Sequence, residues 1–323
     1  MKEKSAQENG QGAGPTRILS LDGGGAKGFY TLGILKEIEA MLGCPIHEHF
    51  SLIFGTSTGA IIAALLALGR SVDEIHDLYR EHVPRVMRQR KPREKTAALT
   101  HLAKTVFGDR KFGDVKTGIG IVATHWMLEK PMIFKGSRTQ AHGTKASFVP
   151  GFGCTIADAV LASCSAYPFL ERAAVTTPAG DEYELIDGGY CANNPTLYAI
   201  ADAVKALGRA HTDLRVVSLG VGAYPEPQHW SAWVKKRVIS IQLLQKTLDV
   251  NTASMEQLRS ILFRDVPTVR INDRFERPEM ATDLFESDLR KLNMLYLRGR
   301  ESFAKYESQL AELLQVGHAA NVS

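Results

Sequence analysis

The chain contains 323 residues, of which 44% are hydrophobic and 23% are charged, and its formal net charge is +4. These proportions are typical of a folded globular protein and exclude wholesale disorder. No apolar run reaches the roughly 18 residues that a membrane-spanning helix needs. The longest run, Ala60 to Leu68, is followed at once by Gly69 and Arg70. The mild positive charge favours anionic surfaces without indicating a nucleic acid polymer as partner.

The N-terminal segment, residues 1–15, is polar and rich in glycine, and it lacks the apolar core of a signal peptide. We therefore predict a disordered leader over residues 1–15. The four cysteines show no C-x-x-C spacing, so we expect free thiols in a reducing, cytoplasmic setting. No metal-binding motif is present, and the sequence calls for no required cofactor.

Strand, turn and helix patterns then follow one another along the chain. Residues 17–21 predict a buried strand, and a glycine-rich loop separates them from a helical pattern over 29–42. Residues 50–54 and 60–68 repeat the arrangement around a second turn, so two β-turn-α units predict a parallel sheet. Further strands are predicted at 117–123, 131–134, 182–186 and 214–219, and further helices near 155–165 and 195–207.

The pattern changes after residue 222. Long helical stretches are predicted over 231–263 and 283–315, joined by a strand-like segment at 268–272. We therefore divide the chain into an α/β domain, residues 16–222, and a mainly helical region, residues 223–323, packed on it. Periodicity does not decide whether that region regulates the domain or mediates self-association.

Gly55-Thr56-Ser57-Thr58-Gly59 fits the pattern G-x-S-x-G and lies between a predicted strand and a predicted helix. A sharp strand-to-helix turn of this kind exposes the central hydroxyl, and the flanking glycines leave it room. The helix that follows directs its positive N-terminal end towards that hydroxyl. The pattern predicts Ser57 as a nucleophile, against the alternative of a turn without chemistry.

A second glycine-rich loop, Asp22-Gly23-Gly24-Gly25-Ala26-Lys27-Gly28, also lies between strand and helix. Several unobstructed N–H groups in such a loop can converge on an oxyanion. The loop could equally hold a nucleotide phosphate in a binding module without catalysis, although it fits neither a Walker loop nor a strong G-x-G-x-x-G match. It could also be a flexible loop without a ligand.

Asp187-Gly188-Gly189 directly follows the predicted strand at 182–186. A carboxylate at a strand end stands where α/β sheets build their sites, although an Asp-Gly-Gly by itself is usually a turn. Asp187 is the candidate general base.

Together the D-G-G-G loop, the G-x-S-x-G turn and the later D-G-G resemble the patatin-like phospholipase family. The resemblance implies a three-layer α/β/α fold with a central, mostly parallel sheet and a helical C-terminal extension. It also implies a dyad of Ser57 and Asp187, without histidine, that cleaves the acyl esters of membrane phospholipids. The amides of Gly23, Gly24 and Gly25 would form the oxyanion hole. Gly55, Gly59, Lys27, Gly188 and Gly189 would support these motifs.

An α/β-hydrolase triad is the rival arrangement, with a histidine after the acid. Its candidates are His211, His229 and His318, none of which follows a convincing strand in a glycine-flanked loop. Without histidine, Asp187 must act as the base, which requires burial to raise its pKa.

The residues from Arg85 to Lys95 include six basic and one acidic side chain. This segment is either a solvated helix end, a contact for anionic lipid headgroups or a site for a phosphate-bearing regulator. Trp230 and Trp233 lie beside Lys235, Lys236 and Arg237 in the sequence. These aromatic side chains could stack on a base or insert at a membrane interface, but packing against the core is favoured.

Overall similarity places the chain near bacterial patatin-like effectors that a cyclic dinucleotide activates in antiphage defence. That resemblance implies a peripheral enzyme at the inner face of the membrane, an allosteric cyclic dinucleotide and a homo-oligomer. A constitutive lipolytic enzyme or an exported toxin remains the alternative.

Overall fold

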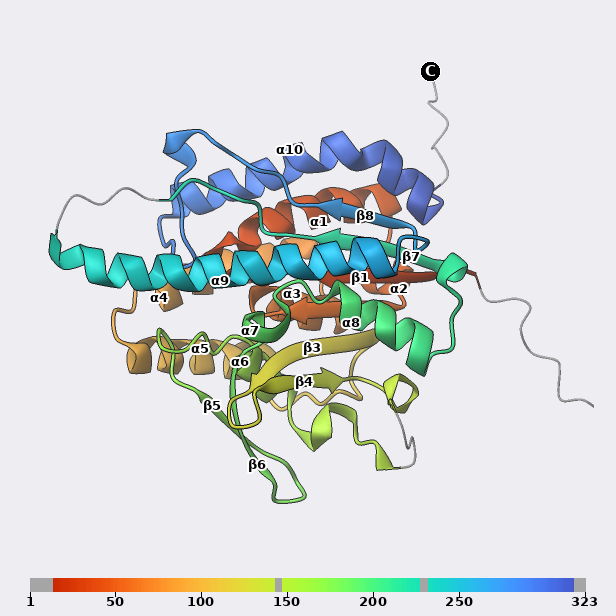
Figure 1. The fold of residues 1–323 in the computed structure, drawn as a ribbon, viewed down its shortest axis with the longest axis horizontal. Coiled ribbons are helices and arrows are strands. Elements are labelled where there is room, and N and C mark those ends of the chain that lie inside the picture. The colour runs from red at the N-terminus through yellow and green to blue at the C-terminus, as the bar shows by residue number, and fades with distance from the viewer. Residues whose placement is uncertain (1–13, 143–146, 227–231, 317–323) are drawn as a thin grey trace, which may run out of the picture.

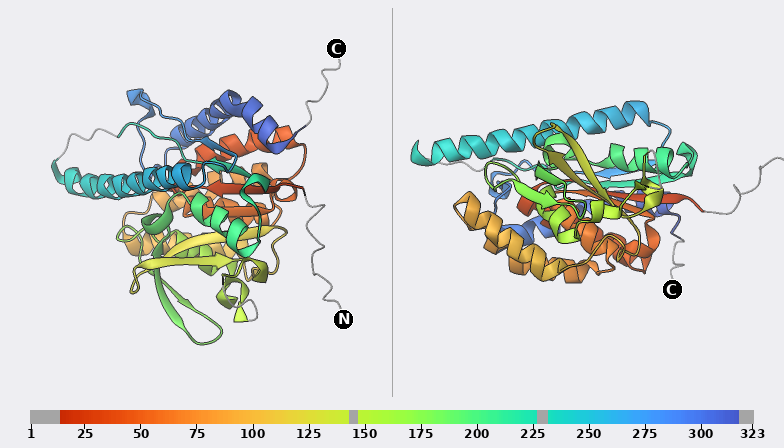
Figure 2. Two further views of the ribbon diagram at one scale, coloured as in Figure 1. Left: turned by 45° about the vertical axis from the view of Figure 1, so that its right-hand side comes forward. Right: turned by 90° about the horizontal axis from the view of Figure 1, so that it is seen from below.

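The computed structural model describes residues 14–142, 147–226 and 232–316, with side chains in the last range from residue 239 onward. The described chain forms one eight-stranded sheet between two layers of helices (Figures 1 and 2). The strands are β1 (Thr16–Leu21), β2 (Leu52–Thr56), β3 (Gly118–His125), β4 (Lys130–Lys135), β5 (Ala173–Thr176), β6 (Glu182–Asp187), β7 (Leu214–Leu219) and β8 (Thr268–Ile271). The predicted leader, residues 1–15, lies almost entirely outside the described residues.

The sheet has the order β5-β6-β3-β2-β1-β7-β8, and β4 pairs with the other edge of β3. Strands β1, β2, β3, β7 and β8 are parallel, whereas β4, β5 and β6 run antiparallel to their neighbours. The sheet is therefore mixed, and its centre is parallel. This agrees with the predicted α/β class. In Figure 1 the parallel strands point to the left, so their carboxyl ends share one edge of the molecule.

Apolar side chains alternate along the central strands between two cores. Leu19 and Ile53 face one core, and Ile18 and Leu52 face the other. The first core is covered by α1 (Gly28–Leu42), α3 (Thr58–Ala67), α4 (Val72–Met87), α5 (Pro92–Phe107), α6 (Ile156–Ser163) and α10 (Leu289–Leu314), with α2 (Ile46–His49) beside them. The second is covered by α7 (Gly189–Ala192) and α8 (Thr196–Ala201) and by the end of α9 (Ala232–Leu262).

The C-terminal elements join the same architecture. Strand β8 pairs in parallel with β7, and α10 packs along α1. Two glycines let these helices touch, because a Cβ at Gly33 would lie 2.0 Å from the carbonyl oxygen of Tyr296, and one at Gly299 equally close to that of Tyr30. The proposed division of the chain at residue 222 stays a prediction.

The sequence analysis missed the two long helices α4 and α5, the short helices α2 and α7, and the short edge strand β5. A signal for α4 was present, because Ser71 and Glu74 form a capping box, with the Ser71 hydroxyl accepting from the Glu74 N–H. The last helix was predicted too early, since α10 begins only at Leu289 and the preceding segment is an irregular loop. That loop contributes to the site described next.

Candidate active site

Ser57 stands in the turn between β2 and α3, with backbone angles φ 53° and ψ −121°. A positive φ is strained for a residue with a side chain and costs of order 1–3 kcal/mol. The flanking glycines make the turn feasible. A Cβ at Gly55 would lie 2.2 Å from the carbonyl oxygen of Gly59, and one at Gly59 would lie 2.3 Å from that of Leu21.

The sheet register brings Asp187 to this turn. Strand β2 runs along one edge of β3 and ends with Thr56 opposite Val122. Strand β6 runs in the opposite direction along the same edge and ends with Asp187 opposite Ala123. The two strands therefore meet end to end, and the Ser57 hydroxyl donates a 2.7 Å hydrogen bond to Asp187 Oδ2.

Burial determines the acidity of Asp187, whose side chain is almost fully enclosed. Loss of solvation raises its pKa from 3.8 to about 6, although the Gly189 N–H and the Ser57 hydroxyl both donate to it and oppose the rise. The Gly189 N–H lies 2.7 Å from Oδ1. Gly188 has no room for a side chain, because a Cβ would lie 2.1 Å from the Val122 carbonyl oxygen. A carboxylate with this pKa is ionised at neutral pH and can still accept a proton.

The end of α6 fixes both halves of this pair, a contribution that the sequence analysis missed. The Ser57 N–H donates to Ser163 Oγ at 2.8 Å, and that hydroxyl donates to the Val122 carbonyl at 2.6 Å. The Asp187 N–H donates to the Ser165 carbonyl at 2.9 Å. Ser163 is fully buried. No sequence motif marks it, since it lies in an ordinary alanine-rich helix.

The glycine-rich loop passes beside Ser57, and a Cβ at Gly23 would lie 3.2 Å from the Cβ of Ser57. The Gly23 N–H already donates to the Asn193 carbonyl at 3.0 Å, and the Ala26 N–H donates to the Leu284 carbonyl at 2.9 Å. Within the described residues the N–H groups of Gly24 and Gly25 have no such partner. Of the three predicted oxyanion donors, the Gly23 N–H is thus already engaged in this structure.

Asp22, the first residue of this motif, does not face Ser57. Its carboxylate forms a bidentate ion pair with Arg270 of β8, and the Asp22 Oδ1 to Arg270 Nη1 distance is 2.8 Å. Asp22 is 2% exposed, so this buried ion pair anchors the loop to the edge strand β8. Sequence reasoning did not find Arg270, because it lies 248 residues away in the chain.

Lys27 is also buried, and it precedes the first turn of α1. Burial lowers its pKa, and the nearby charges of Asp249 and Asp283 oppose that effect. Lys27 is not among the residues that line the pocket beside Ser57.

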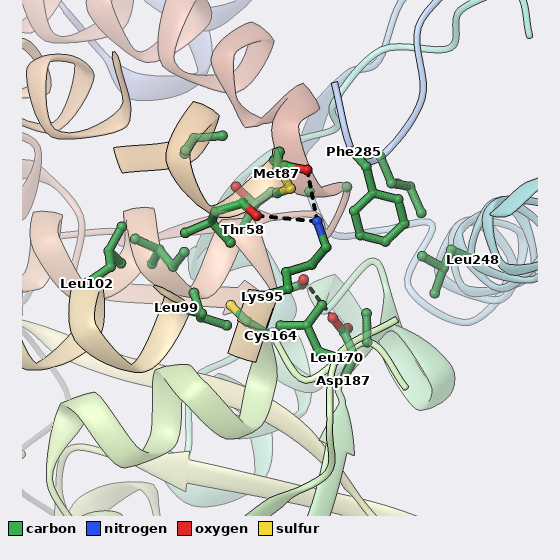
Figure 3. A pocket seen from close by; sticks show the side chains of 18 residues that line it. Thr58, Met87, Lys95, Leu99, Leu102, Cys164, Leu170, Asp187, Leu248 and Phe285 are labelled. Carbon is green, nitrogen blue, oxygen red and sulfur yellow. Dashed lines mark hydrogen bonds between the residues drawn. The ribbon is translucent and has the colours of Figure 1, made fainter. Parts of the chain in front are cut away.

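Ser57 and Asp187 both line one mainly apolar pocket. Apolar side chains of α4, α5 and the C-terminal elements form most of its wall, together with Gly24 and Gly25. Figure 3 shows Leu99 and Leu102 of α5 on one side and Leu248 of α9 and Phe285 on the other. Such a lining suits a hydrocarbon chain better than a phosphate.

Lys95 is the one cation in the wall of this pocket among the described residues. It is 2% exposed, and its Nζ donates to the carbonyls of Val86 and Met87 at the end of α4, at 3.3 and 3.0 Å. The ammonium also lies 4.8 Å from the ring centre of Phe285. Lys95 thus connects α4 and α5 with the loop that precedes α10.

No described histidine lines the pocket. His211 lies just before β7, at the opposite end of the sheet from Ser57, and pairs with Asp265 at 2.7 Å. His229 and His318, with Trp230, fall outside the described residues, and the Trp233 side chain is likewise not described. The described geometry therefore offers Ser57 a carboxylate partner rather than an imidazole.

The structure therefore places a partly buried serine against a buried carboxylate in an apolar pocket. Residues 19–200 match the family model described as patatin-like phospholipase. The chain belongs to the patatin-like phospholipase family.

Two sequence relatives and one solved structure illustrate what the chain is similar to. The chain is 66% identical over 299 residues to the cUMP-AMP-activated phospholipase of Escherichia coli, covering 92% of this chain and 93% of that protein. It is 29% identical over 226 residues to the cGAMP-activated phospholipase of Vibrio cholerae serotype O1, covering 62% and 61% of the two chains. Among solved structures, VipD from Legionella pneumophila aligns with 94% of this chain and 67% of its own, at 14% identity and a TM-score of 0.47.

Proposed function

We propose that Ser57 is the nucleophile and Asp187 the general base of a phospholipase that releases fatty acids from membrane phospholipids. The 2.7 Å hydrogen bond between Ser57 Oγ and Asp187 Oδ2, at the end of an apolar pocket, carries the proposal. The N–H groups of Gly24 and Gly25 are the proposed oxyanion hole, since both residues line the pocket and both amides lack a partner in the described structure.

Each step of the reaction follows from this arrangement. Ser57 Oγ attacks the ester carbonyl carbon while its proton passes to Asp187, and the resulting oxyanion accepts hydrogen bonds from Gly24 and Gly25. The protonated Asp187 then donates to the departing lysolipid oxygen as the carbon–oxygen bond breaks. Water, deprotonated by Asp187, attacks the acyl-serine ester. The fatty acid leaves, and Ser57 regains its proton.

The acyl chain would lie among the side chains of α4 and α5. Burial of each CH₂ group there is worth about 0.8 kcal/mol, so a long chain supplies the binding energy that positions its ester. The pocket wall between Leu99 and Leu248 joins the core helices to the C-terminal region. Movement of that region would change the shape of the pocket.

A fluorophosphonate probe tests the nucleophile directly. We expect the wild-type protein and a Ser51→Ala control, altered at an exposed serine before β2, to be labelled. Ser57→Ala should lose labelling and fatty acid release from vesicles together, and Asp187→Asn should lose most of both. Labelling that persists in Ser57→Ala would show that another residue is the nucleophile.

Activation by a cyclic dinucleotide is the second part of the proposal. It rests on the two relatives whose names specify such activation, one of them at 66% identity over almost the whole chain. We propose that the enzyme is inactive until the nucleotide binds and that it then degrades the host membrane during phage infection. Oligomerisation and a cytoplasmic location remain predictions.

Vesicle hydrolysis measured with cUMP-AMP, with cGAMP and with an equimolar mixture of UMP and AMP tests the regulation. We expect release only with a cyclic dinucleotide. Full activity without nucleotide would contradict the regulatory part and favour a constitutive lipolytic enzyme. A plating assay with phage, comparing cells that carry the wild-type and Ser57→Ala proteins, tests the defence role.

A further inference from the structure

Two exposed turns border the pocket at the edge where the parallel strands end. Helix α3 starts at this edge and runs away from it, so α4 returns to the edge and α5 begins there (Figure 1). The turn between α4 and α5 carries Arg88, Arg90 and Lys91, and Arg93 follows in the first turn of α5. The β3–β4 turn, at the same edge, carries Trp126, Met127 and Leu128. We call these seven residues the docking rim.

Contacts between side chains join the two halves of the docking rim. The Glu171 N–H donates to Thr96 Oγ1, in the first turns of α5, at 2.8 Å. The guanidinium of the next residue, Arg172, lies 5.0 Å from the ring centre of Trp126. The intervening segment also lines the pocket, through Leu170. The docking rim therefore lies next to segments that line the pocket, since Met87 and Lys95 line it as well.

The charges of the rim are exposed and largely unpaired. Residues 88–94 contain four basic side chains and one acidic one. Lys91 pairs with that acid, Glu94, at 3.2 Å, whereas Arg88, Arg90 and Arg93 have no ion pair in the described structure. Because they lie close together in the chain at the start of α5, these guanidinium groups give this surface a positive potential that attracts an anionic bilayer.

The apolar half of the rim is equally exposed. Met127 is 71% and Leu128 57% exposed, and they lie side by side at the tip of a hairpin. Trp126 is 36% exposed and stacks against the Arg172 guanidinium, and tryptophan is a residue type enriched where membranes meet water. Two adjacent apolar side chains at a tip gain free energy when they enter the acyl boundary of a bilayer.

We propose that the docking rim binds the enzyme to anionic phospholipid bilayers, with arginines on the headgroups and Met127 and Leu128 inserted between acyl chains. This inference rests on the proposed function, because a phospholipase that docks through this rim has its pocket next to the lipid. The rim is exposed in the described structure, so binding does not require an activator.

Vesicle flotation in a Ser57→Ala background tests the proposal, since the vesicles then stay intact. The wild-type rim should bind vesicles of phosphatidylcholine with 30% phosphatidylglycerol more tightly than pure phosphatidylcholine vesicles. A basic residue close to such a surface contributes about fivefold in partitioning, so Arg88→Gln, Arg90→Gln and Arg93→Gln together should weaken binding about a hundredfold. Met127→Ser with Leu128→Ser should weaken binding to both vesicle types about tenfold.

A matched control removes three charges from the opposite end of the sheet, through Lys205→Gln, Arg209→Gln and Arg264→Gln, all at exposed positions. It should bind as the Ser57→Ala parent does. Equal losses in the control and in the arginine variant would overturn the proposal, because net charge alone would then explain binding. Unchanged binding in both rim variants would overturn it as well.

Hydrolysis of p-nitrophenyl butyrate, measured in a Ser57-containing background with cUMP-AMP present, separates this proposal from the enzymatic one. A short soluble ester reaches the pocket without a membrane, so both rim variants should hydrolyse it as the wild type does. Loss of vesicle binding with intact ester hydrolysis supports the docking rim. Absent ester hydrolysis in every protein would count against the proposed catalysis, while flotation would still decide the docking.

Discussion

Replacing Asp187 with asparagine should inactivate the enzyme and stabilise its fold. Burial raises the Asp187 pKa from 3.8 to about 6, a difference of about two pH units. At 1.36 kcal/mol per unit, the ionised side chain costs the folded protein about 3 kcal/mol. Asparagine removes that charge and can keep both hydrogen bonds, since its oxygen accepts from the Gly189 N–H and its nitrogen donates to Ser57 Oγ.

The pH dependence of this gain has a definite sign. The folded protein holds the Asp187 proton more tightly than the unfolded chain does. The stability that this proton contributes is therefore fully present below pH 3.8 and is lost as the pH rises through about 6. Asp187→Asn has no ionisable group at this position, so its stability does not change with pH for this reason. Its advantage should therefore be about 3 kcal/mol at pH 8, about half of that at pH 5, and absent near pH 3.8.

Urea unfolding of both proteins at several pH values measures this difference, with exposed Asp77→Asn as the control that should change nothing. Fatty acid release should fall about a hundredfold to ten-thousandfold in Asp187→Asn. In the wild type, activity should rise with pH through about 6 and then level off, because the base must be ionised. Equal or lower stability of Asp187→Asn at pH 8 would refute the claim that burial penalises the charge.

Three further substitutions probe the groups around the dyad. Ser163→Ala removes the acceptor for the Ser57 N–H, so we expect kcat to fall about tenfold with little change in KM, and rescue by Ser163→Thr. Gly25→Ala places a Cβ 2.3 Å from a main-chain carbonyl oxygen at φ +56°, so labelling by the fluorophosphonate probe should be lost. Arg270→Leu leaves Asp22 buried without its partner, and urea unfolding should show a loss of about 3–5 kcal/mol. Wild-type behaviour of any of these variants would contradict the role assigned to that contact.

The local features of the site could be predicted from the sequence because each depends on a few neighbouring residues. A glycine two positions on either side of Ser57 indicates a turn too tight for side chains, and the apolar segments around it predict strand and helix. The same reasoning marks Asp187 at the end of a strand. Short apolar runs also predicted most of the strands, and the succession of strand, turn and helix predicted the α/β class.

Other features depended on long-range packing. Nothing in the local sequence indicates that β2 and β6 meet end to end along β3, and only this register places Asp187 beside Ser57. The roles of Ser163 and Arg270 come from hydrogen bonds across 106 and 248 residues. Likewise, only the tertiary structure shows that the Gly23 N–H is already hydrogen-bonded, to the Asn193 carbonyl 170 residues further along the chain.

By itself, the sequence determined which residues can make sharp turns, bury a carboxylate or react as a nucleophile, because those properties belong to side chains and their immediate neighbours. Only the tertiary structure decided which of these groups share a pocket, which amides are already hydrogen-bonded and how strongly burial raises the Asp187 pKa. Those outcomes depend on contacts between distant segments, and such contacts form only when the sheet assembles.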